Sequence, residues 1–270
     1  MDTVNQFPIN KDQICPQRRT VMLAILMTII SLIGLIWPQT LYPGEGQADA
    51  YRVNDLINIL IGLPGIILAL VLIKRGKLLG VLFLPGAVLY IFYTYIAYLF
   101  GITFSVWSIA WGILVLFSGI IFFRLILNLN AVVLKKRLNG KVPTIFSGIV
   151  LAIFGAAFAG LAFDILSTNQ LALPHPDLGL ALADIVVSLI WLIGGILLLL
   201  KKPVGFAWGL GLLYAAVLLF VAVILVVIAQ PFLTELAFVL DDLVVLAGMA
   251  LVCFIPFGLF VRGVLKKENE

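Results

Sequence analysis

The sequence predicts an all-α integral membrane protein, a bundle of about eight transmembrane helices. Of its 270 residues, 63% are hydrophobic and 11% are charged, and the mean hydropathy is +1.22. Soluble domains average about 45–50% apolar and about 25% charged residues. The composition therefore excludes a soluble globular domain and a disordered chain. Nucleic acid is excluded as a partner although the pI is near 9.1, because the basic residues follow a membrane pattern.

Eight apolar segments are long enough to cross about 30 Å of hydrocarbon at about 1.5 Å per helical residue. They cover residues 20–37, 53–73, 78–100, 105–127, 143–166, 179–200, 204–229 and 236–261. Backbone groups in lipid must be hydrogen-bonded within their own segment, so each segment predicts a helix. We divide the chain into an N-terminal tail (1–19), a first four-helix half (20–139), and a second four-helix half with a short tail (140–270).

The basic residues predict the orientation of these spans. On one side of an eight-span arrangement lie 16 of the 17 Lys and Arg, and Arg52 alone lies on the other. Cytoplasmic loops of membrane proteins carry an excess of Lys and Arg. The prediction is therefore a multi-pass protein of the plasma (inner) membrane with both termini and both tails in the cytoplasm.

Each span of the first half has a sequence feature that predicts its local structure. Arg18 and Arg19 precede the first span, and no small-x-small site follows it, so it is predicted to be an uncleaved helix. Pro64 and Pro85 predict kinks in the second and third spans. Aromatic residues crowd the outer ends of the third and fourth spans, which indicates either an interfacial belt or a pocket for a ligand. The basic, amphipathic residues 124–141 are predicted to extend the fourth helix along the inner leaflet.

The two halves resemble each other in sequence. Asp55 and Asp184 are each followed by a glycine at the same distance, Gly65 and Gly194, an offset of 129 residues. Gly80 and Gly86 of the third span match Gly205 and Gly211 of the seventh, an offset of 125. These matches predict two parallel four-helix repeats, related by an axis along the membrane normal. Sequences rich in Leu, Ile, Val and Gly also give such matches by chance.

Asp184 is the main candidate for a functional residue. Only 16 residues separate it from Lys201, so it is predicted to lie about one turn inside the outer boundary of the membrane. A carboxylate inside a span is costly and is by default a functional hypothesis. Its counterpart Asp55, with Asn58 one turn further on, is the predicted partner in binding a cation, a proton or a cationic head group. The alternative is that each aspartate caps a helix start.

Three further polar residues are candidates for ligand binding. Asp241 and Asp242 precede 19 apolar residues and are predicted to lie at the outer interface. His175, the only histidine, lies between two prolines in an outer loop, where it is a candidate pH sensor or metal ligand or simply a solvated side chain. No Gly-rich phosphate loop, nucleophile elbow or His-Glu-x-x-His motif occurs, so the sequence identifies no catalytic residue, metal or cofactor.

Three functions remain compatible with these observations. The first is a transporter, permease or membrane subunit of one, with an acidic outward-facing cavity formed by the second, sixth and eighth spans. The second is a non-catalytic membrane subunit or assembly factor that binds another membrane protein or lipid. The third is an intramembrane enzyme that uses Asp184 with Asp55, Asp241 or Asp242 as acid and base. In each case the lipid bilayer is the predicted environment.

Overall fold

A computed structural model describes residues 14–44, 46–168, 173–234 and 238–268. All of its regular elements are helices: α1 (Ile14–Ile36), α2 (Pro38–Leu41), α3 (Gln47–Ile57), the π-helical turn η2 (Asn58–Gly62), α4 (Leu63–Lys74), α5 (Leu78–Gly101), α6 (Trp107–Leu127), α7 (Ala131–Leu138), α8 (Thr144–Thr168), α9 (Pro176–Leu199), α10 (Pro203–Leu233) and α11 (Leu240–Glu268). The predicted N-terminal tail lies mostly outside the described residues.

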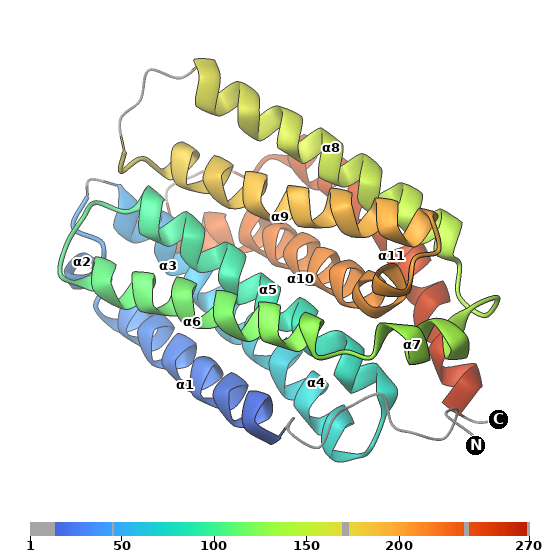
Figure 1. Ribbon diagram of the computed structural model, residues 1–270. Helices are drawn as coiled ribbons and strands as arrows, with labels where there is room; N and C mark the ends of the chain where they lie inside the picture. Colours follow the sequence, from blue (N-terminus) through green and yellow to red (C-terminus); the bar gives the residue numbers. More distant parts are fainter. Residues whose placement is uncertain (1–13, 45, 169–172, 235–237, 269–270) are drawn as a thin grey trace.

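The prediction of a membrane bundle with eight spans is confirmed. Eight helices within the described residues are long and apolar enough to cross a bilayer, and α3, η2 and α4 together form the second of them. They run as long rods alongside one another (Figure 1). Large apolar side chains are exposed on the outer surfaces of α1, α6, α8 and α11, where a soluble protein would carry polar groups. This surface fits lipid, so the protein is a multi-pass membrane protein.

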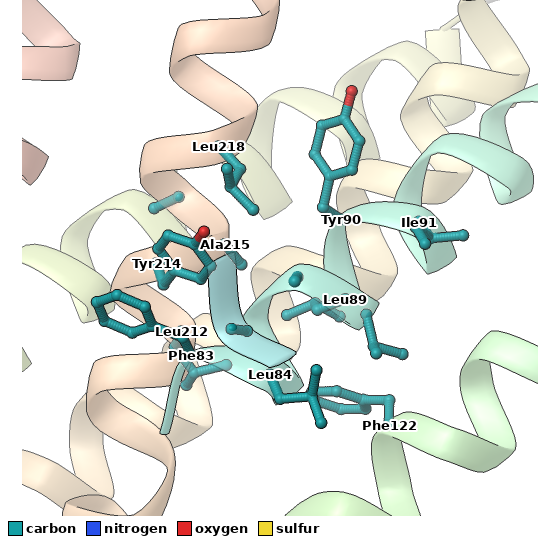
Figure 2. Packing of buried hydrophobic residues seen from close by; sticks show 14 of the residues in the cluster. Phe83, Leu84, Leu89, Tyr90, Ile91, Phe122, Leu212, Tyr214, Ala215 and Leu218 are labelled. Atoms are coloured by element: carbon teal, nitrogen blue, oxygen red, sulfur yellow. The ribbon is translucent and has the colours of Figure 1, made fainter. Parts of the chain in front are cut away.

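Helix α5 forms the centre of the bundle. It packs against α4 and α6 of its own half and against α9 and α10 of the other half. The Phe83 ring of α5 stacks on the Tyr214 ring of α10, with centroids 4.2 Å apart. Figure 2 shows this layer, in which Leu84 of α5 lies beside the Phe122 ring of α6. The buried apolar core is therefore continuous across the two halves.

Two glycines set the crossing of α5 and α10. A Cβ atom at Gly86 would collide with the carbonyl oxygen of Gly211 and would lie 3.0 Å from the backbone nitrogen of Ala215. A Cβ atom at Gly211 would lie 2.9 Å from the carbonyl oxygen of Leu82. The two helices thus meet backbone to backbone, which only small residues allow. The glycines at this contact are the pair that the sequence comparison of the two halves aligned.

Charged side chains separate to the two ends of the bundle. The basic end comprises the ends of α4, α6 and α9 together with α7, and the acidic end comprises the start of α3, the end of α8 and the starts of α9 and α11. The predicted extension of the fourth helix is absent from the described residues: α6 ends at Leu127, and the Asn130 side chain caps a new helix by accepting from the Val133 N–H. Helix α7 packs on α10 and buries Leu134 and Leu138, leaving its basic residues at the basic end.

Candidate ligand-binding cavity

A cavity of about 410 Å³ lies between the two halves, toward the acidic end. It is lined from the first half by α3, η2 and α5, and from the second by α8, α9, α10 and α11. Most of its wall is apolar. The polar residues that line it are Asn54, Asn58, Tyr90, Tyr93, Thr94, Asp184 and Ser188. Its volume falls in the range of small-molecule sites, about 300–1,000 Å³.

Asp184 is the only carboxylate among the described residues that line the cavity. Helix α9 begins at Pro176, and the side chain of His175 caps it by accepting from the Asp177 N–H. Asp184 follows two turns later, about 12 Å along the helix axis. Its Oδ1 accepts a 2.9 Å hydrogen bond from the Tyr93 hydroxyl of α5. Among the described residues it forms no ion pair.

A close approach of α5 and α9 brings Tyr93 to Asp184. A Cβ atom at Gly179 would lie 2.5 Å from the carbonyl oxygen of Ala97 and 2.6 Å from the Cα of Gly101, so only glycine allows this contact. Tyr93 lies one turn before Ala97 on α5, and Asp184 lies just over one turn after Gly179 on α9. The two side chains therefore meet across the wall of the cavity.

A second polar pair lies on the first-half side of the cavity. Asn58, the first residue of η2, accepts a 3.0 Å hydrogen bond from the Tyr90 hydroxyl and donates one of 3.5 Å to the Ser31 hydroxyl of α1. Asn58 and Ser31 are buried, so these bonds satisfy groups that would be costly to leave unpaired. Tyr90 and Tyr93 are three residues apart and thus lie on neighbouring faces of α5.

Aromatic side chains from three helices of the second half form the opposite wall. The ring of Phe158 on α8 lies edge-on to Trp191 of α9, with centroids 6.3 Å apart, and 6.3 Å from the ring of Phe220 on α10. All three residues line the cavity. The site thus combines a carboxylate, two amide side chains and an aromatic wall.

Asp55 is not among the lining residues; it lies beside the cavity in a tyrosine cluster. Its side chain is fully buried and accepts hydrogen bonds from the hydroxyls of Tyr42 and Tyr98, the latter at 3.3 Å. Burial and the neighbouring Asp55 raise the pKa of the Tyr42 hydroxyl well above its usual range, so Tyr42 remains a donor. The rings of Tyr42, Tyr98 and Trp111 pack on one another around the carboxyl group.

The π-helical turn η2 explains why Asp55 and Asp184 face different surroundings. In η2 the Leu63 N–H donates to the carbonyl of Asn58, five residues earlier, which adds one residue to the turn. Ten residues of α-helix leave Asp184 and Gly194 about 80° apart, whereas the added residue leaves Asp55 and Gly65 roughly opposite each other. Accordingly Asp55 faces α1, and Gly65 faces Leu218 of α10.

The remaining predicted residues lie outside the cavity. Asp241 and Asp242 are in the first turn of α11 and are exposed. His175 caps α9, with its Nδ1 3.8 Å from the Asp177 carboxylate. Of the predicted set, the structure therefore brings Asp184 and Asn58 to the cavity. Among the described residues, no three His, Cys, Asp or Glu side chains gather in a way that could hold a metal ion.

Sequence reasoning did not single out the aromatic partners of this site. Tyr93 is one of the aromatic residues that crowd the outer end of the third span, and no sequence pattern distinguishes Trp191 or Phe158. The spacing of Tyr90 and Tyr93 was the available signal, since residues three apart share one side of a helix.

Comparisons with models of protein families, with curated proteins and with solved structures gave no match for this chain. The fold and the cavity define its class: a polytopic helical membrane protein with a mainly apolar cavity between its two halves, in which Asp184 is the one acidic residue among the described lining residues.

Proposed function

We propose that the protein is a transporter or permease, or the membrane subunit of one, and that its substrate binds in the cavity beside Asp184. The observation that carries the proposal is a carboxylate in a cavity of a membrane bundle, held by one tyrosine hydroxyl and no cation among the described residues. A carboxylate within a span costs about 2.5–3.5 kcal/mol on insertion scales. A substrate that binds it would account for its presence.

The relation between the two halves supports this proposal. Helix α5 of the first half packs on α9 of the second, and α10 of the second packs on α3 of the first. In two parallel four-helix repeats, α5 corresponds to α10 and α3 corresponds to α9, so the two contacts are equivalent. The matched Gly86 and Gly211 would then lie at the axis that relates the repeats. Transporters built from such repeats bind substrate at the interface between them.

The orientation of the cavity follows from the distribution of charge. Lys and Arg gather at the basic end, which the positive-inside rule assigns to the cytoplasm of a plasma (inner) membrane. The cavity lies toward the opposite end, because Asp184 is eight residues after the start of α9 and 15 before its end. We therefore infer that the cavity faces outward.

The arrangement favours transport over intramembrane catalysis. An acid–base mechanism needs two groups within reach of one substrate. Asp55 is enclosed by tyrosines outside the cavity, and Asp241 and Asp242 are exposed at the start of α11. Among the described residues that line the cavity, Asp184 thus has no second carboxylate with which to share the chemistry.

One observation favours the alternative of a subunit that binds another membrane protein or lipid. An apolar groove of about 310 Å³ lies between α1 and α4 and is lined by residues such as Ile25, Thr28 and Ile67. The test of function should therefore compare the groove with the cavity.

Cysteine labelling in oriented membrane vesicles provides this comparison. Thr94 lines the cavity and Thr28 lines the groove, and each hydroxyl donates to the carbonyl four residues earlier, so the two positions are closely matched. Thr94→Cys and Thr28→Cys are made in a background in which Cys15 and Cys253 are replaced by alanine. A membrane-impermeant maleimide is then added to right-side-out or inverted vesicles.

A transporter must expose its binding site to both faces of the membrane in turn. We expect the Thr94→Cys variant to react from both faces and the Thr28→Cys variant to react slowly from either, since the groove is apolar. Reaction of the Thr94→Cys variant from one face alone would contradict transport. Reaction no faster than that of the Thr28→Cys variant would contradict a water-filled cavity.

A further inference from the structure

We infer that the cavity selects an organic monocation, a quaternary ammonium or protonated amine that carries an apolar body. This inference rests on the proposed function in one respect: it concerns the same cavity. It is carried by three properties of the cavity: its charge, its aromatic wall and, among the described residues, the lack of a cluster that could hold a metal ion.

The described residues that line the cavity carry charge of one sign. Asp184 is the only acidic residue among its described lining residues, and no Lys, Arg or His is among them. Arg52 and His175, which lie at the same end of the bundle, do not line it. Within a bundle that faces lipid, an unpaired carboxylate attracts a cation strongly and repels an anion. A single carboxylate matches a single positive charge.

The aromatic wall is suited to a cation without strong hydration. Trp191, Phe158 and Phe220 line the cavity together, and the Phe158 ring meets each of the other two at an angle. Faces of aromatic rings attract cations within about 6 Å of the centroid, most strongly for tryptophan, and this is how quaternary ammonium groups are recognised. Leu180, Val187 and Leu219 extend the apolar surface and would hold the body of the ligand.

An inorganic cation fits the cavity less well. Calcium takes six to eight oxygen ligands and magnesium demands an octahedron. Among the described residues, no three His, Cys, Asp or Glu side chains gather in a way that could hold a metal ion, and the cavity lining contributes one carboxylate. A cavity of about 410 Å³ with a mostly apolar wall instead has room for an organic ion.

Binding to the purified full-length protein in detergent tests the inference. Three soluble probes of similar size are compared by isothermal titration calorimetry: benzyltrimethylammonium, neutral N,N-dimethylbenzamide and anionic benzenesulfonate. We expect the cation to bind at least about tenfold more tightly than the other two, which corresponds to the energy of a charge-assisted contact.

Variants locate the binding site. Asp184→Asn is expected to weaken cation binding about tenfold or more, and Phe158→Leu about threefold or more. Asp164→Asn is the matched control, because Asp164 is an exposed acidic residue near the same end of the neighbouring helix α8. It should leave binding unchanged. If Asp184→Asn does not fold, the comparison of the three probes on the unmodified protein decides the question.

Two results would overturn the inference: equal affinity for the cation and the neutral probe, or cation binding that is the same in Asp184→Asn and Asp164→Asn. These outcomes are independent of the labelling experiment. Labelling from both faces without cation selectivity would leave transport standing and remove this substrate class. Cation binding with labelling from one face would keep the site and remove transport.

Discussion

Replacement of Gly86 by alanine should loosen the bundle at its centre. The added methyl group would collide with the carbonyl oxygen of Gly211 and lie 3.0 Å from the backbone nitrogen of Ala215. Both obstacles are backbone atoms of α10, so no side chain can rotate away. The collision is relieved only if α5 and α10 move apart, which also disturbs the stacking of Phe83 on Tyr214.

The expected cost is about 1–3 kcal/mol of the free energy of unfolding, the usual range for overpacking a well-packed interior. Gly211→Ala should cost less, because its added Cβ would lie 2.9 Å from the carbonyl oxygen of Leu82, a smaller overlap than the one at Gly86. Gly112→Ala on α6 is the control, since a Cβ atom there meets nothing within 4 Å. Alanine is the better helix former, so this control should be neutral or stabilising by up to about 1 kcal/mol.

The assay is equilibrium unfolding in mixed detergent micelles, followed by tryptophan fluorescence. The predicted order of stability is Gly112→Ala, then Gly211→Ala, then Gly86→Ala. A Gly86→Ala variant as stable as Gly112→Ala would refute the backbone-to-backbone crossing. A lower stability of Gly211→Ala than of Gly86→Ala would also refute it.

Two further predictions concern Asp55 and Asp242, which the sequence identified as candidate site residues. Tyr42→Phe removes a hydroxyl that donates to the buried Asp55, and we expect a loss of about 1–3 kcal/mol in the free energy of unfolding; an unchanged midpoint of thermal unfolding would contradict the role of Tyr42. Asp242→Asn changes an exposed side chain outside the cavity, so stability should change by less than about 0.5 kcal/mol and titration with benzyltrimethylammonium should be unaffected. Weaker binding of that cation would mean that the start of α11 contributes to the site.

The fold could be predicted because hydropathy alone reports where a chain meets lipid. The second span shows the limit of this signal. Its apolar run begins at residue 53, but its helix begins at Gln47. The extra turns are polar in sequence and are fixed by tertiary contacts: Gln47 donates to the carbonyl of Gly101 at 3.2 Å and accepts from the Thr103 N–H at 3.1 Å. Such long-range bonds leave no local pattern.

The candidate site was predicted in part. Asp184 and Asn58 line the cavity, and both follow from the rule that polar residues within a span face the interior of a bundle. The position of Asp55 could not be predicted from its alignment with Asp184. Pro64 predicts a kink in this span but not the π-helical turn that rotates Asp55, and the tyrosines that hold Asp55 are Tyr42, directly after α2, and Tyr98 of α5.

The crossing at Gly86 and Gly211 also has a mechanical consequence. Every cavity residue on α5 and α10 lies on the acidic-end side of these glycines, as far along α10 as Val226. Val226 is 15 residues, roughly 22 Å, from Gly211. A contact made by two backbones acts as a fulcrum: a change of about 10° in the angle between the helices would move Val226 by about 4 Å, and no helical hydrogen bond would break. The part of the cavity near Val226 could thus be widened or narrowed by a motion centred on the two glycines.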